Sequence, residues 1–224
     1  MKKVLVVALA LVAFICAAGA LLTLVGSVTR EPSVVAPEVS CAPPCWNGII
    51  PGESTYDDVV SAISRVEGID PETMTEGFVR DQAEYVSWSF AYPVPDSNGR
   101  IFFLDGKVAA ILIGTYGSVE LEEVLAWLGP PSRWWTHCTT ELDITWRQTV
   151  LLWPEQGHAV VIDRDPPCLS GEWTPVATND RVAQVIYFEP TTLRDVLQTH
   201  SLFGPDSERA IDEAQPWSPA ELAP

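Results

Sequence analysis

The first hydrophobic pattern along the chain is an uncharged run from Val4 to Val28, preceded by Lys2 and Lys3 and followed by Arg30. As a helix, this run would be about 37 Å long, enough to cross a hydrocarbon core of about 30 Å. Since the lysines precede the run and an acidic chain follows it, the positive-inside rule predicts an exported remainder. We therefore predict that residues 1–30 form a transmembrane anchor or an uncleaved signal.

A cleaved signal peptide is the alternative for this segment. Val4–Ile15 would be its apolar core, and Ala18-Gly19-Ala20 fits the small-x-small cleavage pattern. Cleavage there would expose the apolar residues Leu21–Val25 to water, which favours the retained anchor. Cys16 follows Ile15, whereas lipidation requires a small residue before the cysteine, so we expect Cys16 to be an apolar residue of the membrane helix.

The exported part begins with a first predicted repeat of helix and strands over residues 45–115, and apolar residues at helical spacing mark its start. Ser54 or Thr55 is the expected N-cap, and the helix should end near Gly68. Its apolar stripe consists of Val59, Val60, Ile63 and Val66.

Alternation of apolar and polar residues then predicts strands. One face of the first strand carries Val86, Trp88, Phe90 and Tyr92, and the other carries Tyr85, Ser87, Ser89 and Ala91. The next two strands, Ile101–Leu104 and Val108–Ile113, flank Asp105-Gly106, a pair typical of a tight hairpin.

A second round over residues 116–203 repeats this order. Ser118, in Tyr116-Gly117-Ser118, is the expected N-cap of a helix that Gly129-Pro130-Pro131 ends. The buried stripe of this helix is Leu121, Val124, Leu125 and Leu128. Strands are expected near Leu142–Arg147, Thr149–Trp153, His158–Ile162 and Arg181–Phe188, and a short helix near Thr191–Thr199.

The order of these elements predicts an α+β fold of two related helix-plus-antiparallel-meander repeats, with the helices on one face of the sheet. Residues 31–44 are rich in Pro, Ser, Val and Glu and predict an extended linker. Residues 204–224 predict a disordered tail, in which Trp217 could dock on the domain.

Charge restricts the class of ligand. The chain after Arg30 holds all 30 acidic residues and 10 of the 13 basic residues, a formal charge of −20. Nucleic acids and anionic lipid head groups would be repelled by such a surface. We therefore expect no nucleic-acid partner, and membrane contact only through the N-terminal helix.

Four cysteines follow the membrane segment, an even number in an oxidising compartment. Three pairings are possible, and the local one, Cys41 with Cys45 and Cys138 with Cys168, is favoured. Cys41-Ala-Pro-Pro-Cys45 has three intervening residues, whereas a thioredoxin-type redox site has two. No histidine has paired ligand spacing around these cysteines, so we expect no metal and no cofactor.

Short motifs in both rounds match a known unit of Gly-x-Ser/Thr, amphipathic helix, Leu-Gly-x-Pro and meander. They are Pro51–Thr55, Asp105–Val108, Ser118–Leu128 and Leu128–Pro131. This unit resembles the repeat of the β-lactamase inhibitory proteins and of the small lipoproteins of the outer-membrane barrel-assembly machinery. The opening Pro44–Gly52 is also similar to a group of uncharacterised exported bacterial proteins. The resemblance spans about residues 45–190 and implies this fold and protein binding by the open sheet face.

Residues with catalytic chemistry are sparse. The nucleophile signature Gly-x-Ser-x-Gly is absent, and His137, His158 and His200 are expected at turns or element ends. Asp163-Arg164-Asp165 has a form that can hold a divalent cation, but Pro166-Pro167 makes a strand exit the better interpretation. We therefore predict that the chain is not an enzyme.

A membrane-tethered extracytoplasmic binding or assembly module, with an unknown protein partner at the cell envelope, is the function that these patterns favour. Alternation places Leu142, Ile144 and Trp146 inward, and the predicted binding face is the outward set Tyr85, Ser87, Ser89, Asp143, Thr145 and Arg147. The alternatives are an envelope hydrolase and a carbohydrate-binding module. The latter would use exposed rings of Trp134, Trp135 and Trp173 in predicted loops.

Overall fold

A computed structural model of the chain describes residues 41, 44–79, 83–90, 97–141, 144–164, 176–190, 194, 212–218 and 222–223. All of these belong to one compact unit, Val34–Pro224. No helix in these described ranges is both long and apolar enough to span a bilayer. The predicted anchor over residues 1–30 lies outside the described residues and stays a prediction.

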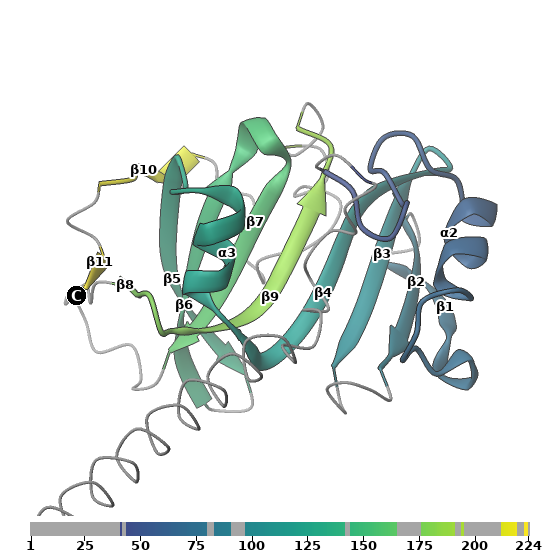
Figure 1. Cartoon of the computed structure of the whole chain (residues 1–224), viewed down its shortest axis with the longest axis horizontal. Coiled ribbons are helices and arrows are strands. Elements are labelled where there is room, and N and C mark those ends of the chain that lie inside the picture. Colours follow the sequence, from purple (N-terminus) through teal and green to yellow (C-terminus); the bar gives the residue numbers. More distant parts are fainter. Residues whose placement is uncertain are drawn as a thin grey trace, which may run out of the picture. The chain divides into compact units, whose positions relative to one another are not determined.

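One large antiparallel sheet dominates the fold (Figure 1). Its strands are β1 (Thr75–Val79), β2 (Ala83–Ser89), β3 (Asn98–Leu104), β4 (Lys107–Glu120), β5 (Arg133–Glu141), β6 (Ile144–Trp153), β7 (His158–Arg164), β9 (Arg181–Phe188) and β10 (Gln215–Pro216). They lie in the order β1-β2-β3-β4-β9-β7-β6-β5-β10, so β9 enters between β4 and β7. The short strands β8 (Val176–Ala177) and β11 (Leu222–Ala223) form a separate parallel pair.

The predicted α+β fold class is wrong, because strands outweigh helices throughout the described residues. The helices whose full length is described are α2 (Tyr56–Ile63) and α3 (Leu121–Leu128), each of eight residues, and two short 3-10 helices, η1 (Pro71–Thr73) and η2 (Pro154–Gln156). Five strands were missed, and the short β10 and β11 among them lie in the predicted disordered tail. β1 follows η1, and β5 contains Trp134 and Trp135, which were expected in a loop. Aromatic and β-branched residues favour such strands once a partner strand is beside them.

The ends of the predicted helices differ from the observed ones. Thr55 caps α2 in a capping box with Asp58, but this helix ends at Ile63 and not near Gly68. β4 runs on to Glu120, which replaces Ser118 as the N-cap of α3. The hairpin prediction is confirmed, since Asp105 and Gly106 link β3 to β4 with φ of 52° and 75°.

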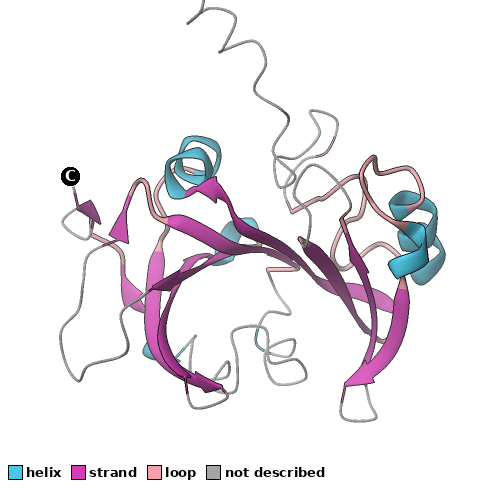
Figure 2. Ribbon diagram, turned by 90° about the horizontal axis from the view of Figure 1, so that it is seen from below, coloured by secondary structure: helices cyan, strands magenta, loops and turns pink. Residues whose placement is uncertain are grey.

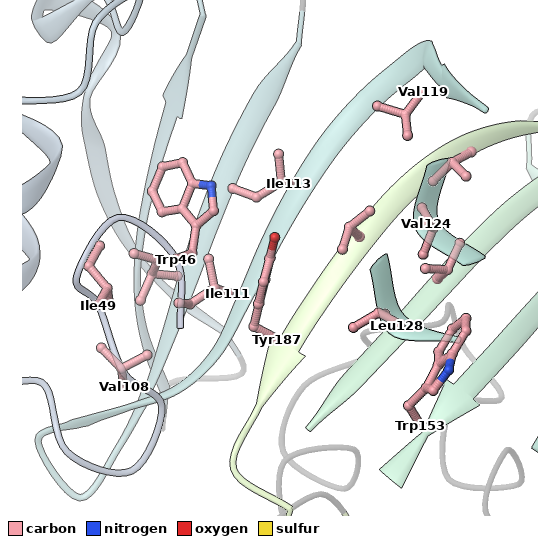
Figure 3. Close-up of a cluster of buried hydrophobic side chains, with 14 of the residues drawn as sticks. Trp46, Ile49, Val108, Ile111, Ile113, Val119, Val124, Leu128, Trp153 and Tyr187 are labelled. Carbon is pink, nitrogen blue, oxygen red and sulfur yellow. The ribbon is translucent and has the colours of Figure 1, made fainter. Parts of the chain in front are cut away.

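A large apolar cluster fills the helix-side face of the sheet. It contains the predicted inward residues Val86, Trp88 and Phe90, whereas Tyr92 lies outside the described residues. Trp46 stacks on Trp88 with ring centroids 5.5 Å apart. Figure 3 shows part of this cluster, in which Trp46 and Tyr187 come from distant parts of the sequence.

A second apolar cluster lies on the other face of the same sheet. Its members include Phe102, Val150, Val161 and Phe188, all buried. The sheet curves like an arch, and α2 and α3 lie on its outer side (Figure 2). Since helix residues belong to the first cluster, the second cluster lies on the inner side of the arch.

Candidate functional site

An irregularity in the long strand β4 shapes the candidate site. Gly114 pairs with Gln184 of β9, and the next pair is Val119 with Val182. The stretch Thr115–Ser118 of β4 therefore faces Ala183 alone on β9, so the backbone bulges out of the ladder. The Thr115 hydroxyl donates a hydrogen bond to the Val182 carbonyl and ties the base of this bulge to β9.

Tyr116 stands at the top of the bulge in the left-handed region, with φ of 46°, and Gly117 follows with φ of 75°. For a non-glycine residue this conformation costs about 1 kcal/mol or more. Tyr116 is nevertheless 63% exposed, so burial of the residue does not offset that cost. Such strained residues cluster at functional sites, where the surrounding structure holds them.

A pocket of about 560 Å³ lies beside this bulge. Polar side chains from β3, β7 and β9 line it together with Tyr116; they are Asn98, Asp163, Arg181 and Gln184. The Nδ2 group of Asn98 donates a hydrogen bond to the Tyr116 hydroxyl over 3.2 Å. Gly114 allows this approach, because a Cβ atom there would lie 3.0 Å from Asn98 Oδ1. The pocket therefore joins hydrogen-bonding groups to one exposed aromatic ring.

Arg181 holds the bulge in place. Its Nη1 donates to the Gly117 carbonyl over 3.1 Å, and its Nη2 lies 3.2 Å from the Glu120 carboxylate. The guanidinium charge is thus offset by a neighbouring carboxylate, although the pair is largely exposed and adds little to stability. Arg181 supports the shape of the pocket more than it supplies a free positive charge.

Asp163 contributes the carboxylate of the pocket. Its Oδ1 accepts a hydrogen bond from Gln148 Nε2 over 3.0 Å. Partial burial raises the pKa of the Asp163 carboxyl above its ordinary value, and the hydrogen bond from Gln148 opposes that shift. Asp163 was predicted only as a strand exit, and Asp165 of the same motif lies outside the described residues.

The predicted binding residues of β2 make contacts within the fold. Tyr85 packs on Phe102 at 6.3 Å, with the Arg100 guanidinium 5.1 Å above the Tyr85 ring. Ser87 hydrogen-bonds Thr75 over 2.8 Å, and the Ser89 N–H donates to Thr73 Oγ1 over 2.8 Å.

Arg147 of β6 lies far from these residues. Four strands separate β2 from β6, which is roughly 24 Å along the sheet at about 4.8 Å per strand. By alternation, Arg147 also belongs to the helix-side face with Leu151 and Trp153, opposite to Tyr85. Of the other predicted residues, Asp143 and the Thr145 side chain lie outside the description. The structure thus does not bring the β2 and β6 residues together.

The cysteine and histidine predictions have mixed outcomes. The Cys41–Cys45 disulfide is present. Cys138 is also disulfide-bonded, but Cys168 lies outside the described residues, so that pairing stays a prediction. His137 lies in strand β5, not in a turn, and stacks on Trp135 at 4.1 Å. His158 is buried, whereas His200 is not described.

Two of the three rings proposed for sugar stacking lie in a strand and not on a loop. Trp134 and Trp135 belong to β5, Trp135 is buried, and Trp134 packs against the helix-side cluster. Trp173 lies outside the described residues. In the parts of the chain that the structure describes, no three His, Cys, Asp or Glu side chains gather closely enough to hold a metal ion.

Sequence reasoning missed the Tyr116 pocket because Tyr116-Gly117-Ser118 was interpreted as the start of a helix. The available signal was an aromatic residue before a glycine within a strand-like run. Comparison of the chain with protein-family models, with curated proteins and with solved structures gives no match in any of the three. The resemblance to the β-lactamase inhibitory proteins and the barrel-assembly lipoproteins therefore stays a prediction.

Proposed function

We propose that this chain is a membrane-tethered, extracytoplasmic binding module without catalytic activity, and that it takes its ligand in the pocket beside Tyr116. The proposal joins two arguments of different origin. The N-terminal charge pattern favours export, and the described domain carries a polar pocket with an exposed ring. A ligand site of this kind is concave and has a few convergent polar groups.

Tyr116 is the observation that carries the proposal. Tyr116 is 63% exposed and its backbone is strained, although glycine or asparagine would fit that conformation at lower cost. An exposed aromatic residue with a left-handed backbone costs free energy in both respects, so stability does not explain why a tyrosine stands at this position. Contact with a bound ligand would explain its presence.

A hydrolase is the weaker alternative for the same pocket. Hydrolysis by paired carboxylates needs two acidic groups that flank the reacting bond. Of the side chains that line the pocket in the described part of the chain, Asp163 alone carries a carboxylate. The lining is thus better suited to holding a ligand than to cleaving it.

Capture of envelope components by the full-length protein tests the proposal. Tyr116→Asn removes the ring but suits the left-handed backbone, so the fold should be kept while capture falls at least tenfold. Asp105→Asn is the matched control, because it changes a residue of similar φ at a hairpin away from the pocket. Equal capture by wild type and Tyr116→Asn would contradict the proposal.

The double variant Tyr85→Ala/Arg147→Ala separates the pocket from the sheet-face residues. Capture should be unchanged, because these two side chains lie on opposite faces of different strands. If this variant loses capture and Tyr116→Asn does not, the sheet face binds the ligand and the pocket does not.

The membrane tether has its own test. Full-length protein should stay with membranes through a carbonate wash and keep Met1 or Lys2 at its N-terminus. A soluble product that begins at Leu21 would show that the segment is a cleaved signal.

A further inference from the structure

We propose that the ligand of the Tyr116 pocket is an uncharged saccharide, an inference that rests on the proposed binding function. Three properties of the pocket carry it: the exposed ring, the mixture of hydrogen-bond donors and acceptors, and the absence of a net attraction for anions. Each of them matches a different part of a sugar.

The ring of Tyr116 offers a flat apolar surface. A pyranose has one face of C–H groups, which can pack on an aromatic ring and remove apolar area from water. The bulge fixes the ring through the Arg181 contact to Gly117 and the Asn98 hydrogen bond to the Tyr116 hydroxyl. A ring that is held before binding loses little conformational freedom when the ligand arrives.

The polar groups beside the ring match hydroxyl groups, which both donate and accept. Asp163 accepts, the Gln184 carboxamide does both, and the Tyr116 hydroxyl accepts from Asn98 and so can donate its own proton. A carboxylate beside carboxamides can bind the paired hydroxyls of a sugar ring through several hydrogen bonds at once.

Charge disfavours other ligand classes. The chain after Arg30 has a formal charge of −20, which repels anionic polymers, and the Arg181 guanidinium is paired with Glu120. A cationic ligand would find Asp163 and one ring, but the Asn98 and Gln184 amides are better matched to hydroxyls. The volume of about 560 Å³ falls within the range of small-molecule sites and suits a short oligosaccharide.

Saturation-transfer NMR on the full-length protein in zwitterionic lipid nanodiscs tests the inference. Nanodiscs avoid maltoside detergents, whose sugar head groups would compete for the pocket. The probes are cellotriose, maltotriose and the trimer of N-acetylglucosamine, with trilysine as the cationic comparison. We expect saturable binding of at least one trisaccharide, with saturation strongest on its ring C–H protons.

The variants separate stacking from hydrogen bonding. Tyr116→Asn should weaken trisaccharide binding at least tenfold, and Tyr116→Phe, which keeps the ring, about threefold or less. Asp163→Asn should weaken trisaccharide binding several-fold, because the charged acceptor is lost. This variant tests the inference if Tyr116→Asn does not fold. Asp105→Asn should bind like the wild type.

Two results would overturn the inference. The first is no saturable binding of any trisaccharide, and the second is trisaccharide binding that Tyr116→Asn and Asp163→Asn leave unchanged. Binding of trilysine alone belongs to the first result and identifies the pocket as a cation site. If the envelope capture experiment still depends on Tyr116 in that case, the binding function stands and the saccharide class alone is wrong.

Discussion

His158 and Asp163 lie on the same strand, β7, but in opposite surroundings. His158 is fully buried on the helix side, where its ring packs against Trp127 at 5.1 Å and Tyr187 at 5.0 Å. Asp163 belongs to the other face and borders the pocket. Desolvation disfavours the charged form of both, since the pKa of His158 is lowered to about 4 and that of Asp163 is raised.

The polar partners around the two residues distinguish their roles. His158 donates one hydrogen bond from Nδ1 to the Gln156 carbonyl over 2.7 Å, and its Nε2 has no partner in the described structure. Asp163 has Gln148 beside it and an open pocket in front of it. A perturbed pKa alone therefore does not mark the functional site, whereas polar neighbours and an accessible cavity together do.

Of these two residues, His158 should have the larger effect on how the free energy of unfolding changes as the pH falls. The folded pKa of about 4 lies below the ordinary value of 6.5, so the unfolded chain binds the proton first as the pH falls. The stability that the neutral ring contributes is fully present above pH 6.5 and is lost towards pH 4, a change of about 3 kcal/mol. Urea unfolding between pH 7.5 and 4 measures it.

His158→Phe is the control for this acid effect, because it keeps an aromatic ring beside Trp127 and Tyr187 but cannot titrate. The free energy of unfolding of this variant should fall less between pH 6.5 and 4 than that of the wild type. Equal pH dependence in the two proteins would mean that His158 is not closed off from water as described.

Gly117→Ala tests whether binding in the pocket depends on the backbone conformation of the β4 bulge. Because φ is 75°, an alanine should lower the free energy of unfolding by about 1 kcal/mol. Gly106→Ala has the same φ and should cost as much, since neither Cβ meets an atom closer than 3.4 Å. Thermal melting should show equal destabilisation of the two variants. The NMR titration should show loss of binding in Gly117→Ala alone. Loss in both variants would point to a general loosening of β4.

Asp163→Asn should have the smallest effect on stability. The raised pKa means that the folded protein holds this proton more tightly, so the stability that Asp163 contributes declines as the pH rises above 3.8. An asparagine keeps the oxygen that accepts from Gln148 and removes the charge, so stability at pH 7 should stay equal or rise slightly. A clear loss of stability would assign Asp163 a structural role like that of His158.

Local patterns were the part of the fold that the sequence could predict. Asp105-Gly106 was recognised because the residue types that suit its backbone are the ones present. Tyr116-Gly117 has nearly the same φ values, 46° and 75°, but tyrosine is not a residue that this conformation favours, so the pair was misread. The exception to the local rule coincides with the candidate site.

Long-range pairing could not be predicted. The position of β9 between β4 and β7 depends on pairs such as Ala110 with Phe188, which no local pattern encodes. The inward and outward residues of β6 were also ambiguous, because Val150 and Leu151 are both buried on opposite faces of the sheet. The pocket combines residues from β3, β4, β7 and β9, so it could be found only after these strands were placed.

β9 lies between β4 and β7 in the sheet but follows both of them in the sequence, and this order affects folding. Until residues 181–188 are available, β4 and β7 each present an unpaired edge, and such edges invite pairing with other chains. Contacts between distant parts of a sequence also form slowly. We therefore expect the emerging chain to need protection from aggregation until β9 has paired. A chain that stops before Arg181 should fail to resist proteolysis in any of its strands, including the four that precede α3.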